Sequence, residues 1–218
     1  MSRTMLNHGI YDLAEAAVLV GASTDQLVAW SHLSSRKLKP VVTPAFERAF
    51  SFDDLVTLRV AARIRQLGVS DRDLRCGVDL LRQRFSTELP LATKSILDRL
   101  ATSGESFLAD LGDGLMDIGK GEQGVFESVV QLDLQRIHFN ADGEPDRWMA
   151  ADHVVLDPRV QAGAPCVADT RVLTATIYDL IDQVPAEDLA LDFDLTVEQI
   201  LAAVDFETTL HGGVALAL

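Results

Sequence analysis

The stretch AVLVGASTDQL, residues 17–27, decides how the N-terminal part of this chain is expected to fold. Within it a small residue, a glycine and a leucine follow one another at spacings of four and six, at Ala17, Gly21 and Leu27. In a helix-turn-helix unit the small residue lets two helices cross closely, the glycine forms the turn, and the apolar residue anchors the second helix. The sequence therefore predicts two short helices joined at residue 21.

The same spacing recurs near the C-terminus in ALDFDLTVEQI, residues 190–200, at Ala190, Asp194 and Ile200. In both stretches a hydroxyl residue starts the second helix and a glutamine follows three positions later, which is the pattern of a capping box. These pairs are Ser23 with Gln26 and Thr196 with Gln199. A second helix-turn-helix unit is therefore predicted at the C-terminus.

The two units lie in opposite electrostatic settings. Residues 1–90 carry 12 lysines and arginines against 10 acids, whereas residues 91–218 carry 7 against 23. The whole chain has a formal net charge of −14 at pH 7. Because phosphate is repelled by such a charge, we expect at most one DNA-facing patch, in the N-terminal part.

Periodicity, caps and turn residues predict a mainly α fold with small β-hairpins, that is, an α+β protein. Helices are expected at residues 11–20, 23–31, 52–67, 71–85, 91–100, 122–135, 175–183, 185–193 and 197–207. Hairpins are expected within residues 31–50 around Val41-Val42, at 107–118, and at 137–149 with its turn near 140–143. A short strand is expected at 154–156.

Several classes of function are not expected. The five histidines show no metal-ligand spacing, and we predict neither a metal nor a cofactor nor an enzyme. The sequence G-x-G-x-x-G at 119–124 is interpreted as a glycine-rich turn, because a dinucleotide site needs a parallel βαβ unit and the preceding strand is expected to be antiparallel. The absence of a long apolar run or a signal peptide, with two separate cysteines, favours a cytoplasmic protein without a membrane segment.

Seven arginines stand between residues 59 and 84, against three acids. Two interpretations of this basic stretch remain open. It extends a contact with phosphate, or it forms a solvated helix face with ion pairs between residues four apart.

The N-terminal layout resembles a MerR-like winged helix, down to SFDDL at 51–55 and QLGVS at 66–70. The resemblance implies that residues 23–31 form the recognition helix and that the basic wing after it touches the DNA backbone. The expected DNA contacts are Ser23, Thr24, Gln26, Trp30, His32, Arg36, Lys37, Lys39 and Arg48. A helical bundle without a DNA role is the alternative, since residues 23–31 include no lysine or arginine.

The stretches DPRVQAGAPCVADTRV, residues 157–172, and VPAEDLALDFDLTVEQILAAVDF, residues 184–206, resemble the family of domain of unknown function 433 (DUF433). That resemblance implies a homeodomain-like helix set at the C-terminus. Two positions depart from the family pattern: Asp169 stands where glycine is common, and Ala164 stands where a basic residue often follows the glycine. Both changes make the local charge more negative.

A MerR-like unit followed by a DUF433-like unit resembles the VapB-type antitoxins of toxin–antitoxin pairs. This implies a homodimer that represses its own operon and neutralises a PIN-like (VapC-type) ribonuclease, whose active site holds a cluster of carboxylates. Its toxin contacts would include Arg159, Arg171 and Asp169, with one of the two arginines entering that cluster. Arg171 is favoured over Arg159, because it lies in the family-like Thr-Arg step at the rim of the turn. For Arg171 the alternative is a structural ion pair with a neighbouring carboxylate.

The resemblance also implies three domains: DNA binding in residues 1–90, an α+β linker or dimerisation segment in 91–150, and toxin binding in 151–218. Two other functions remain open. One is a stand-alone MerR-like regulator that senses a small ligand through residues 91–150, and the other is an interaction adaptor.

Overall fold

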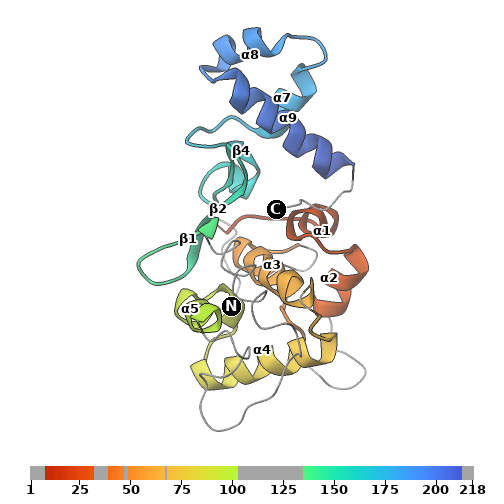
Figure 1. Ribbon diagram of the computed structural model, residues 1–218, viewed down its shortest axis with the longest axis vertical. Helices are drawn as coiled ribbons and strands as arrows, with labels where there is room; N and C mark the ends of the chain where they lie inside the picture. Colours follow the sequence, from red (N-terminus) through yellow and green to blue (C-terminus); the bar gives the residue numbers. More distant parts are fainter. Residues whose placement is uncertain (1–7, 32–38, 47–48, 67, 103–134, 213–218) are drawn as a thin grey trace.

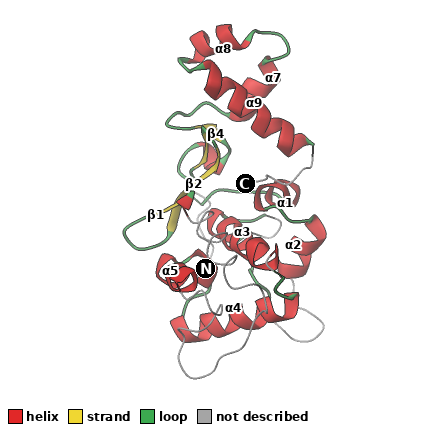
Figure 2. Ribbon diagram, in the orientation of Figure 1, coloured by secondary structure: helices red, strands yellow, loops and turns green. Residues whose placement is uncertain are grey.

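The computed structural model describes residues 8–31, 39–46, 49–66, 68–102 and 135–212 of the 218-residue chain. Figure 1 shows an elongated molecule with the N-terminal helices in its lower part, a small sheet in the middle and the C-terminal helices at the top. Helices dominate, and the strands are confined to that one sheet (Figure 2). The described residues therefore form a mixed α+β fold, as the sequence predicted.

Four helices build the N-terminal part: α1 (Leu13–Val20), α2 (Thr24–Ser31), α3 (Phe52–Gln66) and α4 (Asp71–Phe85). Their bounds agree with the predicted helices to within a few residues. Helices α3 and α4 each start at a serine cap, because Ser51 Oγ accepts the Asp54 N–H and Ser70 Oγ accepts the Asp73 N–H, both at 3.2 Å. Eleven of the fifteen residues of α3 are buried, so α3 is the central helix around which the others pack.

The turn between α1 and α2 closes on a left-handed residue. Gly21 has φ 72°, and its N–H donates to Val18 O at 3.1 Å. The next N–H, of Ala22, reaches back to Ala17 O at 3.0 Å. These two bonds satisfy the last carbonyls of α1, and glycine takes this backbone conformation without a steric penalty.

The C-terminal pair repeats this turn 173 residues later, since positions 17, 21 and 27 correspond to 190, 194 and 200. Helix α8 (Ala186–Phe193) ends at Asp194, which has φ 56°, and α9 (Val197–His211) follows. The Leu195 N–H donates to Ala190 O at 2.8 Å, as Ala22 does to Ala17. Both predicted capping boxes are formed, and the two apolar anchors, Leu27 and Ile200, are fully buried.

The middle of the chain supplies a four-stranded antiparallel sheet in the order β1-β2-β3-β4. The strands are β1 (Ile137–Phe139), β2 (Pro145–Ala151), β3 (Val154–Leu156) and β4 (Cys166–Val167). The β1–β2 pair is the predicted hairpin, and its turn closes through the Asn140 N–H on Glu144 O at 2.8 Å. Ile137, Trp148 and Leu156 lie in one row across three strands, and all three are buried.

The elements that remain are short. The predicted helix at 91–100 is a 3₁₀ turn, η1 (Pro90–Ala92), followed by α5 (Lys94–Thr102). A second 3₁₀ turn, η3 (Gln161–Gly163), precedes β4, and α7 (Thr174–Leu180) begins the C-terminal helices. The predicted hairpin at 107–118, the glycine-rich turn at 119–124 and most of the predicted helix at 122–135 lie outside the described residues.

One large hydrophobic core joins the N-terminal helices to the middle of the chain. It runs from Tyr11 through α1–α5 to the inner face of the sheet, and it includes Phe206 of α9. A second, smaller cluster lies among α7, α8 and α9. The main core therefore continues across residue 90, where the sequence predicted a boundary between domains, and that boundary stays a prediction.

The predicted β-hairpin around Val41-Val42 is wrong. Neither residue lies in a strand, and both are fully buried. Their N–H groups converge on the Trp30 carbonyl, at 2.7 and 3.4 Å, and the guanidinium of Arg82 binds the Pro40 and Val41 carbonyls at 2.7 and 2.6 Å. The backbone groups that a hairpin would pair are thus bound by the end of α2 and by an arginine of α4.

Tyr11 joins the N-terminal segment to the loop before β4. Its main chain pairs with Phe50 in both directions, at 3.0 and 2.9 Å, and its buried hydroxyl donates to Gly163 O at 2.9 Å. Gly163 has φ 88°, and a Cβ built there would lie 2.5 Å from the Tyr11 hydroxyl and 3.0 Å from Gly9 Cα. Glycine is therefore required at 163 both by its backbone angle and by the close approach of residues 9 and 11.

We expect Gly163→Ala to lower the free energy of unfolding by about 3 kcal/mol, because left-handed strain is added to a displaced, buried tyrosine. The control is Gly143→Ala. That residue also has a positive φ, 79°, but its Cβ would meet only Lys94 Cβ, at 3.7 Å. The free energy of unfolding of the Gly143→Ala variant should fall by only about 1 kcal/mol, from backbone strain alone. Urea denaturation measures both values, and equal losses would contradict the proposed close packing at Tyr11.

Candidate functional site

The first turn of α2 presents small polar residues to solvent. Ser23 and Thr24 are exposed, and Gln26 is half-buried. The Ser23 hydroxyl accepts the Gln26 N–H at 3.2 Å, while Gln26 Oε1 accepts the Ser23 N–H at 3.0 Å. Two of the predicted DNA contacts therefore also build the cap that starts the helix, and Thr24 lies beside them on the same exposed turn.

The structure corrects the prediction made for Trp30. It was predicted as a DNA contact, but its side chain is fully buried and its indole N–H donates to Asp71 Oδ1 at 3.1 Å. The ring therefore anchors α2 to the start of α4. Lys39 is exposed, and its Nζ lies 3.0 Å from Asp79 Oδ1. The other predicted DNA contacts, His32, Arg36, Lys37 and Arg48, lie outside the described residues.

Three of the seven arginines between residues 59 and 84 hold the fold together. Arg59 is buried, donates to Val20 O at 3.2 Å, and lies over the Trp148 ring at 5.6 Å from its centre. Arg75 is also buried and donates to the Lys39 and Ala29 carbonyls. These guanidinium groups bind backbone carbonyls of other elements, which neither interpretation of the sequence anticipated.

Arg82 is the third of these arginines. Beyond Pro40 and Val41 it also donates to Glu88 O, at 2.9 Å, so one side chain joins α4 to two loops. Burial lowers the pKa of its guanidinium, while Glu88 and Asp79 act in the opposite direction. A cation held this way contributes to stability and is not available to phosphate.

The Asp-Pro turn after β3 holds one of the two cations of residues 152–218. Asp157 accepts two bonds from the Arg159 guanidinium, at 2.9 and 2.8 Å, and a third from the Arg159 N–H at 2.8 Å. Burial acts to raise the pKa of the Asp157 carboxyl, but the bonds from Arg159 and the charge of Arg147 hold it below its usual value. Arg159 Nη2 also lies 3.7 Å from Asp146, so this arginine is surrounded by carboxylates of its own chain.

The other cation, Arg171, lies in a different environment. Its residue is exposed, and its carbonyl accepts Gln161 Nε2 at 3.2 Å. Within the described ranges, no hydrogen bond or ion pair reaches its guanidinium. The turn beneath it is fixed by Thr170, whose hydroxyl donates to Val167 O at 2.8 Å and accepts the Val172 N–H at 3.1 Å.

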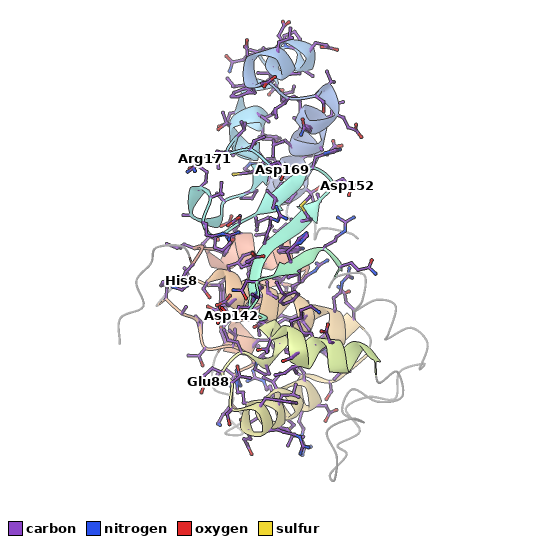
Figure 3. The ribbon with its side chains drawn as sticks, turned by 90° about the vertical axis from the view of Figure 1, so that its left-hand side faces the viewer. His8, Glu88, Asp142, Asp152, Asp169 and Arg171 are labelled. Carbon is purple, nitrogen blue, oxygen red and sulfur yellow. The ribbon has the colours of Figure 1, made fainter. Side chains whose placement is uncertain are left out.

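Asp169 lies two residues before Arg171, and Figure 3 shows both at the level of the sheet. Its φ is 61°, which explains physically why glycine suits this position. Its carboxylate is largely exposed and lies 3.9 Å from Arg147. The structure therefore brings Asp169 and Arg171 together on one exposed turn, while Arg159 is held separately by Asp157.

A group of polar side chains between α1, α7 and α9 was not predicted from the sequence. Glu207 is buried, and the Thr174 hydroxyl bonds to its carboxylate. His211 Nε2 lies 3.7 Å from Glu207, and its ring stacks on Tyr178 at 5.0 Å. Burial, followed by the charges of Asp12 and Glu207, raises the pKa of Glu15 to about 7.

This raised pKa of Glu15 predicts a pH-dependent stability. Because ionised Glu15 is disfavoured in the folded chain, stability is fully present below its ordinary pKa of 4.5 and is lost as the pH rises through about 7. Glu15→Gln should therefore raise the melting temperature by roughly 3 °C at pH 8 and have almost no effect at about pH 4, below the ordinary pKa of the carboxyl. The control, Glu187→Gln, changes an exposed acid in the first turn of α8 and should give no rise at pH 8. A pH-independent effect of Glu15→Gln, measured by circular dichroism, would contradict the burial of this carboxyl.

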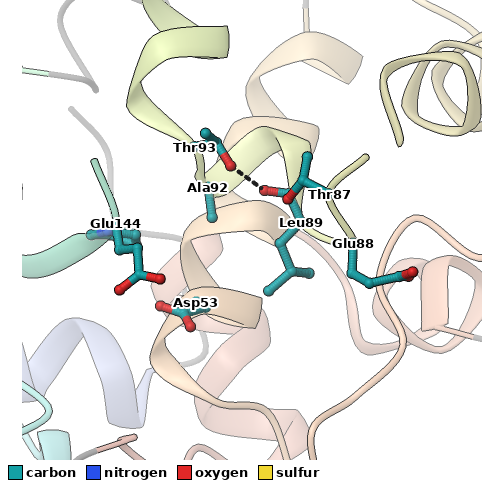
Figure 4. A pocket seen from close by; sticks show the side chains of 8 residues that line it. Asp53, Thr87, Glu88, Leu89, Ala92, Thr93 and Glu144 are labelled. Atoms are coloured by element: carbon teal, nitrogen blue, oxygen red, sulfur yellow. Dashed lines mark hydrogen bonds between the residues drawn. The ribbon is translucent and has the colours of Figure 1, made fainter. Parts of the chain in front are cut away.

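A hollow of about 200 Å³ lies between the start of α3, the turn after α4 and the β1–β2 hairpin (Figure 4). It is lined by Asp53, Thr87, Glu88, Leu89, Ala92, Thr93, Glu144 and Pro145. The Thr93 hydroxyl donates to Leu89 O at 3.1 Å at its rim. With three acids in its wall, the hollow is more polar than the apolar pockets that usually bind small molecules.

Among the residues that the structure describes, no group of three or more histidine, cysteine or acidic side chains is placed to hold a metal ion. No helix among those residues is long and apolar enough to cross a membrane.

Comparison with known proteins supports the C-terminal assignment and the fold. Residues 154–206 match the family described as protein of unknown function (DUF433), so the chain contains a DUF433 domain. The whole chain is 26% identical to uncharacterized protein Rv2308 of Mycobacterium tuberculosis, over 93% of this chain and 92% of that protein. The crystal structure of Rv2018 from Mycobacterium tuberculosis has the same fold, with a TM-score of 0.68, 23% identity, and coverage of 92% of this chain and 99% of that one.

Proposed function

We propose that the chain is the antitoxin of a type II toxin–antitoxin pair. Its DUF433 domain neutralises a PIN-like ribonuclease by direct contact, and its MerR-like N-terminal unit binds operator DNA as a homodimer and represses the operon. The observation that carries this proposal is that two helix pairs of matching geometry lie in opposite charge environments. Equivalent scaffolds with opposite charge suit different partners.

The N-terminal pair suits DNA because its second helix starts with exposed, small, polar side chains. Ser23 and Thr24 leave the N-terminus of α2 accessible, and a helix N-terminus attracts phosphate. Arg36, Lys37 and Arg48 lie in the segment that follows α2 in the sequence, and exposed Lys39 belongs to it too. DNA binding is therefore proposed for α2 together with this basic segment.

The C-terminal pair suits a protein. Residues 152–218 contain 2 cations and 12 acids, a net charge of −10, which repels a DNA duplex. A ribonuclease needs cations to hold its RNA, so the surface around its active site attracts this acidic domain. Arg171 is the cation placed to enter the carboxylate cluster of the ribonuclease, because Arg159 already binds Asp157.

Arg171→Ala should weaken the complex with the ribonuclease by on the order of 2–5 kcal/mol, because carboxylates of the toxin would be left unpaired. The melting temperature of the isolated chain should not change. Arg159→Ala is the matched variant, and it should lower the melting temperature, since Asp157 loses its partner, with a smaller effect on affinity. Calorimetric titration measures the affinity of both variants for the ribonuclease, and thermal melts measure their melting temperatures. A lowered melting temperature with unaltered affinity for Arg171→Ala would assign it a structural role instead.

DNA binding should depend steeply on salt. With about four phosphate contacts per protomer, the logarithm of affinity should fall against the logarithm of salt with a slope of roughly −7 for a dimer. Changing Arg36, Lys37 and Lys39 to alanine should flatten that slope, whereas Lys94→Ala, which removes a cation paired with Asp98, should not. Fluorescence anisotropy with DNA from upstream of the chain's own gene measures the slopes. An unchanged slope for the triple variant would refute the role of this segment.

The proposal as a whole is tested by co-expression. The ribonuclease encoded beside this chain should arrest growth when expressed alone, and co-expression of the chain should restore growth and give a complex that co-purifies. If the chain neither restores growth nor binds the ribonuclease, the antitoxin function is refuted.

A further inference from the structure

Helix α9 presents a mixed acidic and apolar stripe on its outer side. Leu201 is 50% exposed, so half of this apolar side chain is in contact with water. Glu198 lies one turn before it and Asp205 one turn after it, and both are exposed. The opposite side of α9 is buried through Ile200 and Ala203. The leucine is therefore at the centre of a row of carboxylates on the outer side of the helix.

Helix α8 repeats this arrangement. Leu191 is 81% exposed, the largest exposed fraction among the big apolar side chains of the described residues. Glu187 and Asp188 lie one turn before it, Asp192 follows it, and all three are exposed. Helix α8 forms the end of the molecule farthest from α4 (Figure 1). A side chain this exposed contributes little to the folding of the chain itself, because it is hardly removed from water.

We propose that this acidic–leucine face of α8 and α9 docks on a basic protein surface that has an apolar hollow at its centre. We assign to this face the exposed acids and leucines of the two helices, Glu187, Asp188, Leu191, Asp192, Glu198, Leu201 and Asp205. This inference rests on the proposed function, and it assigns the face to the surface around the RNA channel of the ribonuclease. The leucines enter the hollow and provide affinity, while the carboxylates meet lysines and arginines at the rim.

The negative charge of this face favours a basic protein over a DNA duplex or a second copy of the chain. A DNA duplex is repelled by five carboxylates on the face. A second copy of the chain would bring the same charges against themselves, so self-association through this face is disfavoured. Only a basic partner gains from both the leucines and the acids. One carboxylate, Glu198, also lies 3.6 Å from His153 Nε2, and the other four have no ion pair in the described part of the chain.

The test uses the full-length chain and the purified ribonuclease encoded beside it. Changing both Leu191 and Leu201 to serine should weaken binding at least tenfold while the chain stays folded, with only a small fall in melting temperature from the half-buried Leu201. Changing Asp188 and Asp205 to asparagine should slow association severalfold at low salt and have little effect at high salt. The control is Val28→Ser, which removes a 41% exposed apolar residue from the position of α2 equivalent to Leu201, and it should leave binding unchanged.

The possible results distinguish the antitoxin function from the docking face on α8 and α9. Binding of the wild-type chain that is unaffected by the double serine variant keeps the antitoxin function and overturns this docking face. A wild-type chain that does not bind the ribonuclease overturns both. Sedimentation velocity of the chain alone adds one outcome: a wild-type dimer that the double serine variant converts to monomer would show that a second copy occupies the face, and would overturn the assignment to a basic partner.

Discussion

The arrangement of the two helix pairs depends on one buried side chain, Tyr11. Its main chain is paired with Phe50, just before the central helix α3, and its hydroxyl is bonded to Gly163, in the loop before β4. No Cβ can be accommodated at Gly163 without moving the tyrosine. Arg59 adds a second link, from the end of α1 to Trp148 in the sheet. Together these contacts join the N-terminal helical core to the sheet and to the loop that leads into β4.

The two helix pairs share their turn geometry because the same local rules operate in each. A left-handed residue satisfies the carbonyls that end the first helix, and a capping box satisfies the N–H groups that start the second. Those rules constrain few positions, so the exposed residues can vary with the partner. At the start of α2 they include small hydroxyl residues and one acid, Asp25, with Val28 a turn later, and around α8 and α9 they are carboxylates with single leucines. A division of partners by charge therefore needs no change in the fold.

Features determined by neighbouring residues could be predicted from the sequence, and features that depend on distant contacts could not. The caps and the bounds of most described helices follow from local signals, and the structure confirms these to within a few residues. The predicted helix at 91–100 is instead a 3₁₀ turn followed by α5, and the helix predicted at 122–135 is almost entirely untested. The hairpin at Val41 failed because Arg82, some forty residues away, binds the carbonyls of that segment. The buried Glu207 left no local signal either. In the candidate site the sequence favoured Arg171 over Arg159 from its place in the Thr-Arg step. The contact between Arg159 and Asp157, which supports that preference, was found only in the structure.

The central claim is that one chain binds DNA through its N-terminal pair and a ribonuclease through its C-terminal pair. In Figure 1, α2 lies in the lower, N-terminal part of the molecule and α8 at the opposite end, so the two partners should not compete for one surface. Sedimentation velocity of the chain mixed with labelled operator DNA and the ribonuclease measures this directly. A single species that contains all three components is expected. Displacement of the DNA by the ribonuclease, or of the ribonuclease by the DNA, would contradict it.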